Sequence, residues 1–243
     1  MATQRRPYRL YYSPDSASIV PRILLAELGA PCEAILVDRA RNEQQSPEYR
    51  RLNPQGLLPV LIDGNSVVFE TGAIVQYLCD LHGRLAPGVD SGARGDFCKW
   101  LFYLSNTLHA DLRILFYTHR YTVDVDSVPA LRRGMRQRIG EHFGLLDRVL
   151  QASETGWLLD WGLSACDFYL AVCARWAVLY PPGEALTSPV PMDFPGVARV
   201  LERLQERPAV LAAYRTERIP PPVFTHPQRP EGMERLLRGG VDS

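Results

Sequence analysis

The sequence predicts an α/β domain with a small mixed sheet, followed by an all-α helical-bundle domain. Strand-type and helix-type spacings of apolar residues alternate over about the first eighty residues, and only helix-type spacing follows residue 96. A stretch rich in Gly, Pro and small polar residues, 83–95, separates the two patterns. With 243 residues, 46% of them hydrophobic, the chain is long enough to bury two modest cores.

The first elements of the α/β domain are a strand, a loop and a helix. Arg9–Tyr12 is a short aromatic and apolar run that predicts a strand. Ser13–Ser16, which includes Pro14 and Asp15, has the composition of a turn. Apolar residues then recur at helical spacing over Ile19–Leu28, and Gly29 is expected to end that helix.

A second strand, a short helix, a hairpin and a last helix complete this domain. The short helix is expected to begin at Ser46-Pro47, and Asp63-Gly64-Asn65 predicts the turn of the hairpin. The strands and the last helix cover Ala34–Val37, Leu57–Ile62, Ser66–Phe69 and Thr71–Leu81. The order βαβαββα combines a parallel crossover with an antiparallel hairpin, so the sheet is expected to be mixed, with helices on its faces.

The second domain is predicted to contain helices joined by short polar or Pro-bearing connections. Ser164 to Asp167 resembles a helix capping box, with Asp where Glu or Gln is usual. The expected helices cover residues 96–121, 128–152, 164–179, 196–206 and 209–215. The predicted boundaries are 1–83 for the α/β domain, 84–95 for the linker, 96–218 for the helical domain and 219–243 for an extended Pro-rich tail.

Composition and charge argue against several classes of function. Lys plus Arg and Asp plus Glu both number 27, so no net field would attract nucleic acid or an anionic membrane. No span reaches the ~20 apolar residues that cross a bilayer, and the N-terminal residues do not resemble a secretory signal. The five cysteines are scattered, with no C-x-x-C pair, and no histidines are spaced for a metal. We therefore expect a cytoplasmic protein that acts on small molecules without a metal.

Four segments, in order along the chain, resemble the cytosolic glutathione S-transferase family. They are Tyr11 to Ser16, Asn53 to Leu61, Phe69 to Leu78, and the Ser164 to Asp167 box with Glu206-Arg207-Pro208. The helical half is similar to bacterial beta-type members, at positions such as Trp100, Leu108-His109 and Arg175-Trp176-Ala177. The resemblance implies a thioredoxin-like first domain that holds glutathione, a helical domain that shapes the second-substrate pocket, and a homodimer.

The resemblance also implies which residues hold glutathione. It implies a cis Leu58-Pro59 bond that presents the backbone of Leu58 to the cysteinyl part of glutathione, like an added strand. Glu70 and Thr71 would bind the γ-glutamyl ammonium and carboxylate at the start of a helix. Family members often carry a polar or basic residue where this chain has Gly56 or Leu57, so one glycyl contact is expected to be either missing or supplied by Arg41.

Catalysis requires glutathione as the thiolate, which a hydroxyl near a helix N-terminus can stabilise. Ser16 stands where serine-type members keep their activating hydroxyl, Ser18 would serve in a shifted register, and Tyr12 lies earlier, on the strand. The beta-type cysteine is replaced by Ala17, so the resemblance implies a serine-type loop on a beta-like body. The alternative is that either serine only caps the helix and that Tyr12 belongs to the core.

The second-substrate pocket is expected on the helix that contains His109. Aromatic and basic side chains one or two turns away would form its walls, namely Phe102, Tyr103, Arg113 and Tyr117. Helix packing is an equally good explanation of the same pattern, and a structural role of His109 stays open.

Three functions are consistent with these residues. The first is conjugation of glutathione to a hydrophobic electrophile, as in detoxification. The second is use of glutathione as a cofactor for isomerisation, dehalogenation or ether cleavage. The third is a non-catalytic glutathione-binding protein, for which Ala17 and the uncharged Gly56-Leu57 pair are the arguments.

Overall fold

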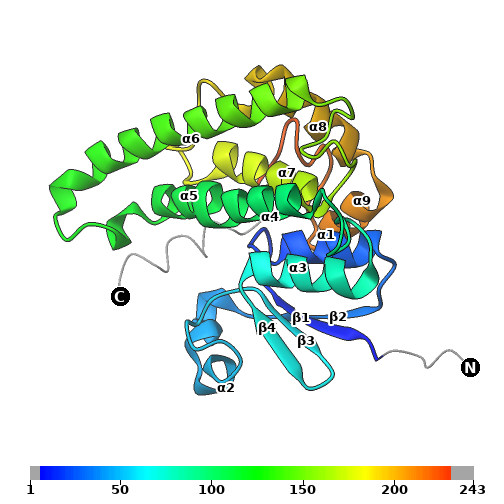
Figure 1. Cartoon of the computed structure of the whole chain (residues 1–243). Coiled ribbons are helices and arrows are strands. Elements are labelled where there is room, and N and C mark those ends of the chain that lie inside the picture. The colour runs from blue at the N-terminus through cyan, green and yellow to red at the C-terminus, as the bar shows by residue number, and fades with distance from the viewer. Residues whose placement is uncertain (1–5, 231–243) are drawn as a thin grey trace, which may run out of the picture. The chain divides into compact units, whose positions relative to one another are not determined.

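The structure, a computed structural model, describes residues 6–230, and Figure 1 shows its elements. The chain divides into two compact units, each described by itself below. The α/β unit contains residues up to 82 and residues 208–220, and the helical unit contains 83–207 and 221–228. The predicted tail therefore divides between the two units, and its residues 231–243 lie outside the described part of the chain.

The α/β unit contains a four-stranded mixed sheet in the order β2-β1-β3-β4. Strands β1 and β2 are parallel, with Leu10 opposite Ala34, whereas β3 is antiparallel to both β1 and β4. The elements are β1 (Tyr8–Tyr12), α1 (Ile19–Glu27), β2 (Cys32–Leu36), α2 (Pro47–Arg50), β3 (Val60–Asp63), β4 (Ser66–Phe69), α3 (Thr71–His82) and α9 (Pro208–Thr216). The predicted order βαβαββα and the predicted mixed sheet are confirmed, and the fold is thioredoxin-like.

The two faces of the sheet are covered by different helices. Val60 and Ile62 pack with Tyr49 of α2. Leu61, which lies between them and is fully buried, points to the opposite face because side chains alternate along a strand. Helices α1 and α3 lie on that opposite face, as Figure 1 shows. Ser46 begins α2 as predicted, with its hydroxyl accepting the Tyr49 N–H at 3.2 Å.

The last helix within residues 6–230 belongs to the α/β unit and not to the helical domain in which it was predicted. Helix α9 packs along α1 and buries Val210, Ala213 and Tyr214. At its end, the hydroxyl of Thr216 accepts a 2.6 Å hydrogen bond from Arg22 of α1. The apolar spacing of residues 209–215 predicts the helix, but spacing carries no information about which core the helix joins.

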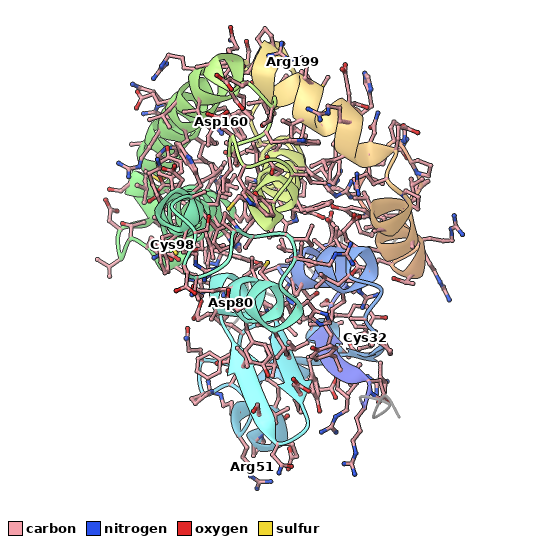
Figure 2. The ribbon with its side chains drawn as sticks, turned by 45° about the vertical axis from the view of Figure 1, so that its right-hand side comes forward. Cys32, Arg51, Asp80, Cys98, Asp160 and Arg199 are labelled. Atoms are coloured by element: carbon pink, nitrogen blue, oxygen red, sulfur yellow. The ribbon has the colours of Figure 1, made fainter. Side chains whose placement is uncertain are left out.

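The helical unit contains α4 (Arg94–Tyr103), α5 (His109–Phe116), α6 (Val128–Ala152), α7 (Ala165–Leu179) and α8 (Pro195–Gln205). The helix predicted over residues 96–121 is divided, because a π-helical turn at Leu104–Leu108 separates α4 from α5. Helix α7 is buried on all sides from Ala165 to Ala177. Helix α8 instead directs Arg199 to solvent and buries Val200 and Leu201, and Figure 2 labels Arg199.

Helix α7 begins at the predicted capping box. The Asp167 carboxylate accepts the N–H of Ser164 at 2.8 Å and the N–H of Leu158 at 2.8 Å. Burial of Asp167 raises the pKa of its carboxyl to about 6, although these hydrogen bonds act in the opposite direction. Within residues 6–230, no helix is long and apolar enough to cross a membrane.

Candidate active site

Two serine hydroxyls meet in the loop between β1 and α1. The Oγ atoms of Ser16 and Ser18 lie 2.8 Å apart. The Ser18 hydroxyl also lies 3.4 Å from the carbonyl oxygen of Ser13, to which it can donate. The carbonyl of Ser16 accepts the N–H of Ile19 at 3.0 Å, which fixes the loop to the first turn of α1. The hydroxyl pair is therefore held directly at a helix N-terminus.

The two serines differ in their access to solvent. Ser18 has no exposed surface, whereas Ser16 is partly exposed. A bound thiol can therefore approach Ser16 without a rearrangement of the loop, and Ser18 can act on that thiol through Ser16. A hydrogen bond from the inner hydroxyl to the outer one polarises the outer hydroxyl as a donor.

Tyr12, the third predicted thiol partner, ends β1 and is half-buried. The guanidinium carbon of Arg22 lies 3.9 Å from the centroid of its ring. Arg22 is itself 8% exposed, so the cation and the ring form a largely buried stack. This stack packs the Tyr12 ring against α1.

A second loop presents the backbone of Leu58. The Leu58-Pro59 bond is cis, as the resemblance implies. Before it, the carbonyl of Leu57 accepts hydrogen bonds from the side chains of Asn53 and Tyr49, both at 2.8 Å. Among the described residues, neither the N–H nor the C=O of Leu58 has a hydrogen-bond partner. The backbone of Leu58 is thus available for strand-like pairing with an extended peptide.

Gly56 is required for the approach of this loop to its neighbours. Its φ is +64°, and a Cβ atom there would lie 2.6 Å from Nε2 of Gln45 and 2.9 Å from the carbonyl oxygen of Gln44. Only glycine combines this backbone conformation with so close a contact.

Glu70 and Thr71 lie at the junction between β4 and α3. Glu70 has a φ of +71° and an exposed carboxylate that accepts the Gln55 side-chain N–H at 2.9 Å. Thr71 is the buried first residue of α3, where the N–H groups of the first turn have no partner within the helix. This junction offers a carboxylate for a cation beside N–H donors for an anion, the pattern that an amino acid group requires.

Gln55 is a candidate site residue that the sequence does not indicate. Fifteen positions separate it from Glu70, and no short-range pattern in the sequence indicates that the two side chains meet. Arg41, which was predicted to contact the glycyl end of glutathione, lies in a short 3₁₀ turn. Its side chain is 87% exposed, and its Nε lies 3.6 Å from the Asp38 carboxylate.

The residues predicted for the second-substrate pocket lie on α4, on α5 and just after α5. His109 is half-buried, with Nδ1 hydrogen-bonded to the Tyr169 hydroxyl at 2.8 Å and its ring centroid 4.9 Å from that of Trp176. Burial lowers the pKa of His109 to about 4, and the nearby charge of Arg113 lowers it further. His109 is therefore neutral at pH 7.

The remaining four predicted pocket residues have different surroundings. The Tyr103 hydroxyl is hydrogen-bonded to Nδ1 of His142 at 2.6 Å, and Phe102, next to it, is 51% exposed. Arg113 donates to the Tyr121 hydroxyl at 2.6 Å, and the ring of Tyr117 lies against Phe116. Within residues 6–230, no three His, Cys, Asp or Glu side chains are grouped so that they could hold a metal ion.

Comparisons with known proteins show which chains this protein is similar to. The family model described as Glutathione S-transferase, N-terminal domain, matches residues 6–80. The chain is 28% identical over 171 residues to Glutathione S-transferase GST-4.5 of Xanthomonas campestris, a match that covers 70% of this chain and 82% of that protein. It is 33% identical over 108 residues to Glutathione S-transferase F10 of Arabidopsis thaliana, and the match spans half the length of that relative.

A solved structure extends the likeness over both parts of the chain. The glutathione transferase of Burkholderia graminis, with two glutathione molecules bound per protein subunit, is 28% identical and has a TM-score of 0.75. The match covers 86% of this chain and 88% of that one. A thioredoxin-like sheet followed by a mostly helical part is the fold class that this chain shares with the glutathione transferases. Residues 6–80 belong to the glutathione S-transferase N-terminal domain family, and the chain as a whole is similar to glutathione S-transferases.

Proposed function

We propose that this protein activates glutathione as its thiolate with the Ser16 hydroxyl and conjugates it to a hydrophobic electrophile. The observation that carries this proposal is the 2.8 Å contact between the hydroxyls of Ser16 and Ser18 at the start of α1. It gives the partly exposed Ser16 a buried donor, so that the proton of Ser16 remains available for a sulfur anion. Ser18 is a positioning residue in this scheme, and Tyr12 packs beside the loop.

The chemical step follows from the thiolate. Ser18 has a single proton, which in this scheme it donates to Oγ of Ser16 at 2.8 Å instead of to the Ser13 carbonyl at 3.4 Å. Ser16 donates its own O–H to the sulfur, and the helix N-terminus adds a favourable field. Lowering the thiol pKa by about 2 requires roughly 2.7 kcal/mol, which these interactions together can supply. The thiol proton passes to solvent as the thiolate forms. The sulfur electron pair then forms a bond to the electrophilic carbon, and the leaving group departs with the electron pair of the bond that breaks.

Glutathione is held in this proposal by the backbone of Leu58 and the junction at Glu70 and Thr71. The Leu58 N–H and C=O pair with the cysteinyl residue beside Pro59, Glu70 binds the γ-glutamyl ammonium, and the first turn of α3 binds its carboxylate. Arg41 would bind the glycyl carboxylate after leaving Asp38. The proposed second-substrate residues remain Phe102, Tyr103, His109, Arg113 and Tyr117.

A titration of the bound thiol tests the proposal. Ultraviolet difference spectra of glutathione bound to the parent protein, to Ser16→Ala and to Ser18→Ala give the thiol pKa of each complex. We expect a lowered pKa in the parent, a large rise in Ser16→Ala and a smaller rise in Ser18→Ala. A parent complex with the pKa of free glutathione, or a Ser16→Ala variant that matches the parent, contradicts the assignment.

Product analysis tests the reaction type. Incubation with a chlorodinitroarene and glutathione should give a thioether conjugate and consume one glutathione per product molecule. Glutathione recovered unchanged or as its disulfide, with a converted substrate, indicates the cofactor role instead. Binding without turnover of any electrophile indicates a binding protein.

The proposal includes a cytoplasmic homodimer that acts in detoxification, with no nucleic-acid or membrane partner. The family resemblance supports the dimer, and light scattering after size-exclusion chromatography measures it. A mass near 27.4 kDa would show a monomer and contradict this part of the proposal.

A further inference from the structure

The carboxylate of Glu217 binds the backbone of the loop that contains Ser16. Glu217 directly follows α9, and its side chain has no exposed surface. Its Oε2 accepts the N–H of Asp15 at 2.7 Å. Although these residues are 202 positions apart, both belong to the α/β unit. A buried carboxylate is costly unless it is paired and hydrogen-bonded, so its partners indicate what it holds in place.

Arg22 pairs with the same carboxylate. Its Nε lies 3.4 Å from Oε1 of Glu217, its Nη1 donates to the Thr216 hydroxyl at 2.6 Å, and its guanidinium stacks on the Tyr12 ring. Arg22 and Glu217 therefore form a buried pair of opposite charges between α1 and α9. Since the two charges offset each other, the pair has little net field at the loop, and its main effect there is geometric.

The hydrogen bond to Glu217 is made at a strained point of the loop. Asp15 has a φ of +52°, in the left-handed region that a residue other than glycine occupies at a cost. Such a conformation persists where surrounding contacts determine it. The next residue is Ser16, whose N–H donates to the carbonyl of Ser13 at 3.2 Å. The direction in which the Ser16 side chain leaves the loop therefore depends on the backbone of Asp15.

We infer that Glu217 is a positioning residue for thiol activation, holding Asp15 so that the Ser16 hydroxyl points at the glutathione sulfur. This inference rests on the proposed function of Ser16. Packing alone does not account for Glu217, because Val210, Ala213 and Tyr214 already supply an apolar face to α9. The carboxylate adds a backbone contact one residue before the proposed catalytic hydroxyl.

Two conservative variants separate the effect of the side-chain length of Glu217 from the effect of its charge. Glu217→Gln keeps an acceptor oxygen at the same distance from the backbone but removes the charge, which leaves the cation of Arg22 uncompensated. Glu217→Asp keeps the charge and withdraws the carboxylate by one methylene. A positioning role predicts that Glu217→Asp raises the bound thiol pKa, whereas Glu217→Gln leaves it unchanged or lowers it. If only the charge mattered, Glu217→Asp would match the parent, and Glu217→Gln alone would shift the thiol pKa, downward.

The experiment measures the thiol pKa of bound glutathione in the parent, Glu217→Ala, Glu217→Asp and Glu217→Gln, together with the rate of conjugation from pH 6 to pH 9. We expect Glu217→Ala and Glu217→Asp to raise the pKa by ~0.5–1, so that the rate falls about 2- to 5-fold at pH 6.5 and recovers near pH 9. General destabilisation would instead lower the rate of conjugation by the same factor at every pH.

Asp147→Ala provides the matched control. Asp147 lies on α6 and is also buried, and its carboxylate also accepts a backbone N–H, that of Gly196 at 2.5 Å. Its removal should lower stability and leave the thiol pKa at the parent value. The inference is overturned if the thiol pKa rises equally in Asp147→Ala. It is also overturned if the thiol pKa stays at the parent value in both Glu217→Ala and Glu217→Asp. If Glu217→Ala does not fold, the Asp and Gln variants decide the question.

The result distinguishes this inference from the proposed function. If the thiol pKa is not lowered in the parent complex, the result contradicts both the proposed function and the role of Glu217. If the thiol pKa is lowered in the parent and rises in Ser16→Ala but not in the Glu217 variants, the result contradicts only the role of Glu217.

Discussion

Gln55 donates its side-chain N–H to the carboxylate of Glu70 at 2.9 Å. This bond connects the loop before the Leu58-Pro59 bond to the junction at which α3 begins. The two segments proposed to hold glutathione are therefore linked through their own side chains, and the Glu70 carboxylate is oriented before any ligand arrives. Orientation before binding reduces the side-chain entropy that the protein loses when the ligand binds.

Glu70→Gln should weaken glutathione binding about tenfold, because a charge-assisted hydrogen bond to the ligand ammonium becomes a neutral one. Gln55→Ala should weaken binding less, about 2- to 5-fold, since it removes only the orientation of Glu70. Isothermal titration calorimetry measures both. The control is Glu48→Gln on α2, another exposed glutamate of the same unit, which should bind like the parent. Parent-like affinity in Glu70→Gln would remove this residue from the proposed site.

Gly56→Ala should lower the free energy of unfolding more than Gly64→Ala. Both glycines have positive φ, +64° and +58°, so each substitution carries the same backbone cost of about 1 kcal/mol. A Cβ at Gly64 meets nothing within 4 Å, whereas one at Gly56 would approach the side chain of Gln45 and the backbone of Gln44. We expect an excess of about 1–3 kcal/mol for Gly56→Ala, measured by urea unfolding. Equal losses of unfolding free energy in the two variants would mean that the loop at Gly56 accommodates the added Cβ atom without a further cost.

Much of the fold could be predicted from the sequence because its signals are local. The hairpin turn at Gly64, the cap at Ser46 and the box at Ser164 each depend on residues within a few positions. The predicted helix over Val128–Ala152 coincides with α6. Strand β3 begins at Val60 instead of the predicted Leu57, because the carbonyl of Leu57 accepts hydrogen bonds from the side chains of Tyr49 on α2 and Asn53 in the preceding loop.

The contacts between distant segments could not be predicted in this way. Glu217 meets Asp15 across 202 positions, and Gln55 meets Glu70 across 15. Both are polar contacts that depend on the finished packing of α9 on α1 and of the loop on β4. The roles of Ser16 and Ser18 are likewise open in the sequence, since only their exposures, and not their spacing, distinguish the outer hydroxyl from the inner one.

Asp167→Ala should destabilise the helical unit by about 3 kcal/mol or more. The substitution leaves the buried N–H groups of Leu158 and Ser164 and the Ser164 hydroxyl without the acceptor they have in the parent. Asp160→Ala is the control, because Asp160, labelled in Figure 2, accepts the N–H of Glu154 in an exposed loop. There, water can replace the carboxylate, and we expect a loss below about 1 kcal/mol. Thermal unfolding followed by circular dichroism measures both variants, and similar losses would contradict the role given to burial.

His109 should make the parent protein sensitive to acid between about pH 6.5 and pH 4. Its pKa in the folded protein is about 4, below the ordinary value of 6.5, so the unfolded chain binds the proton more tightly. The stabilisation that His109 gives by remaining neutral is therefore complete above pH 6.5 and is lost as the pH falls through 4. The full loss corresponds to about 3 kcal/mol.

His109→Phe keeps an aromatic ring against Trp176 but cannot take up the proton. At pH 7 it should be less stable than the parent, because the Tyr169 hydroxyl loses a 2.8 Å hydrogen bond. Between pH 6.5 and pH 4, however, the parent should lose stability relative to His109→Phe, so the difference between the two narrows or changes sign. Asp167 titrates in the same window with the opposite sign, since its pKa is raised to about 6. Its contribution is present in both proteins and cancels in the comparison. A difference in unfolding free energy that stays constant from pH 7 to pH 4, measured by urea unfolding, would show that protonation of His109 is not coupled to folding.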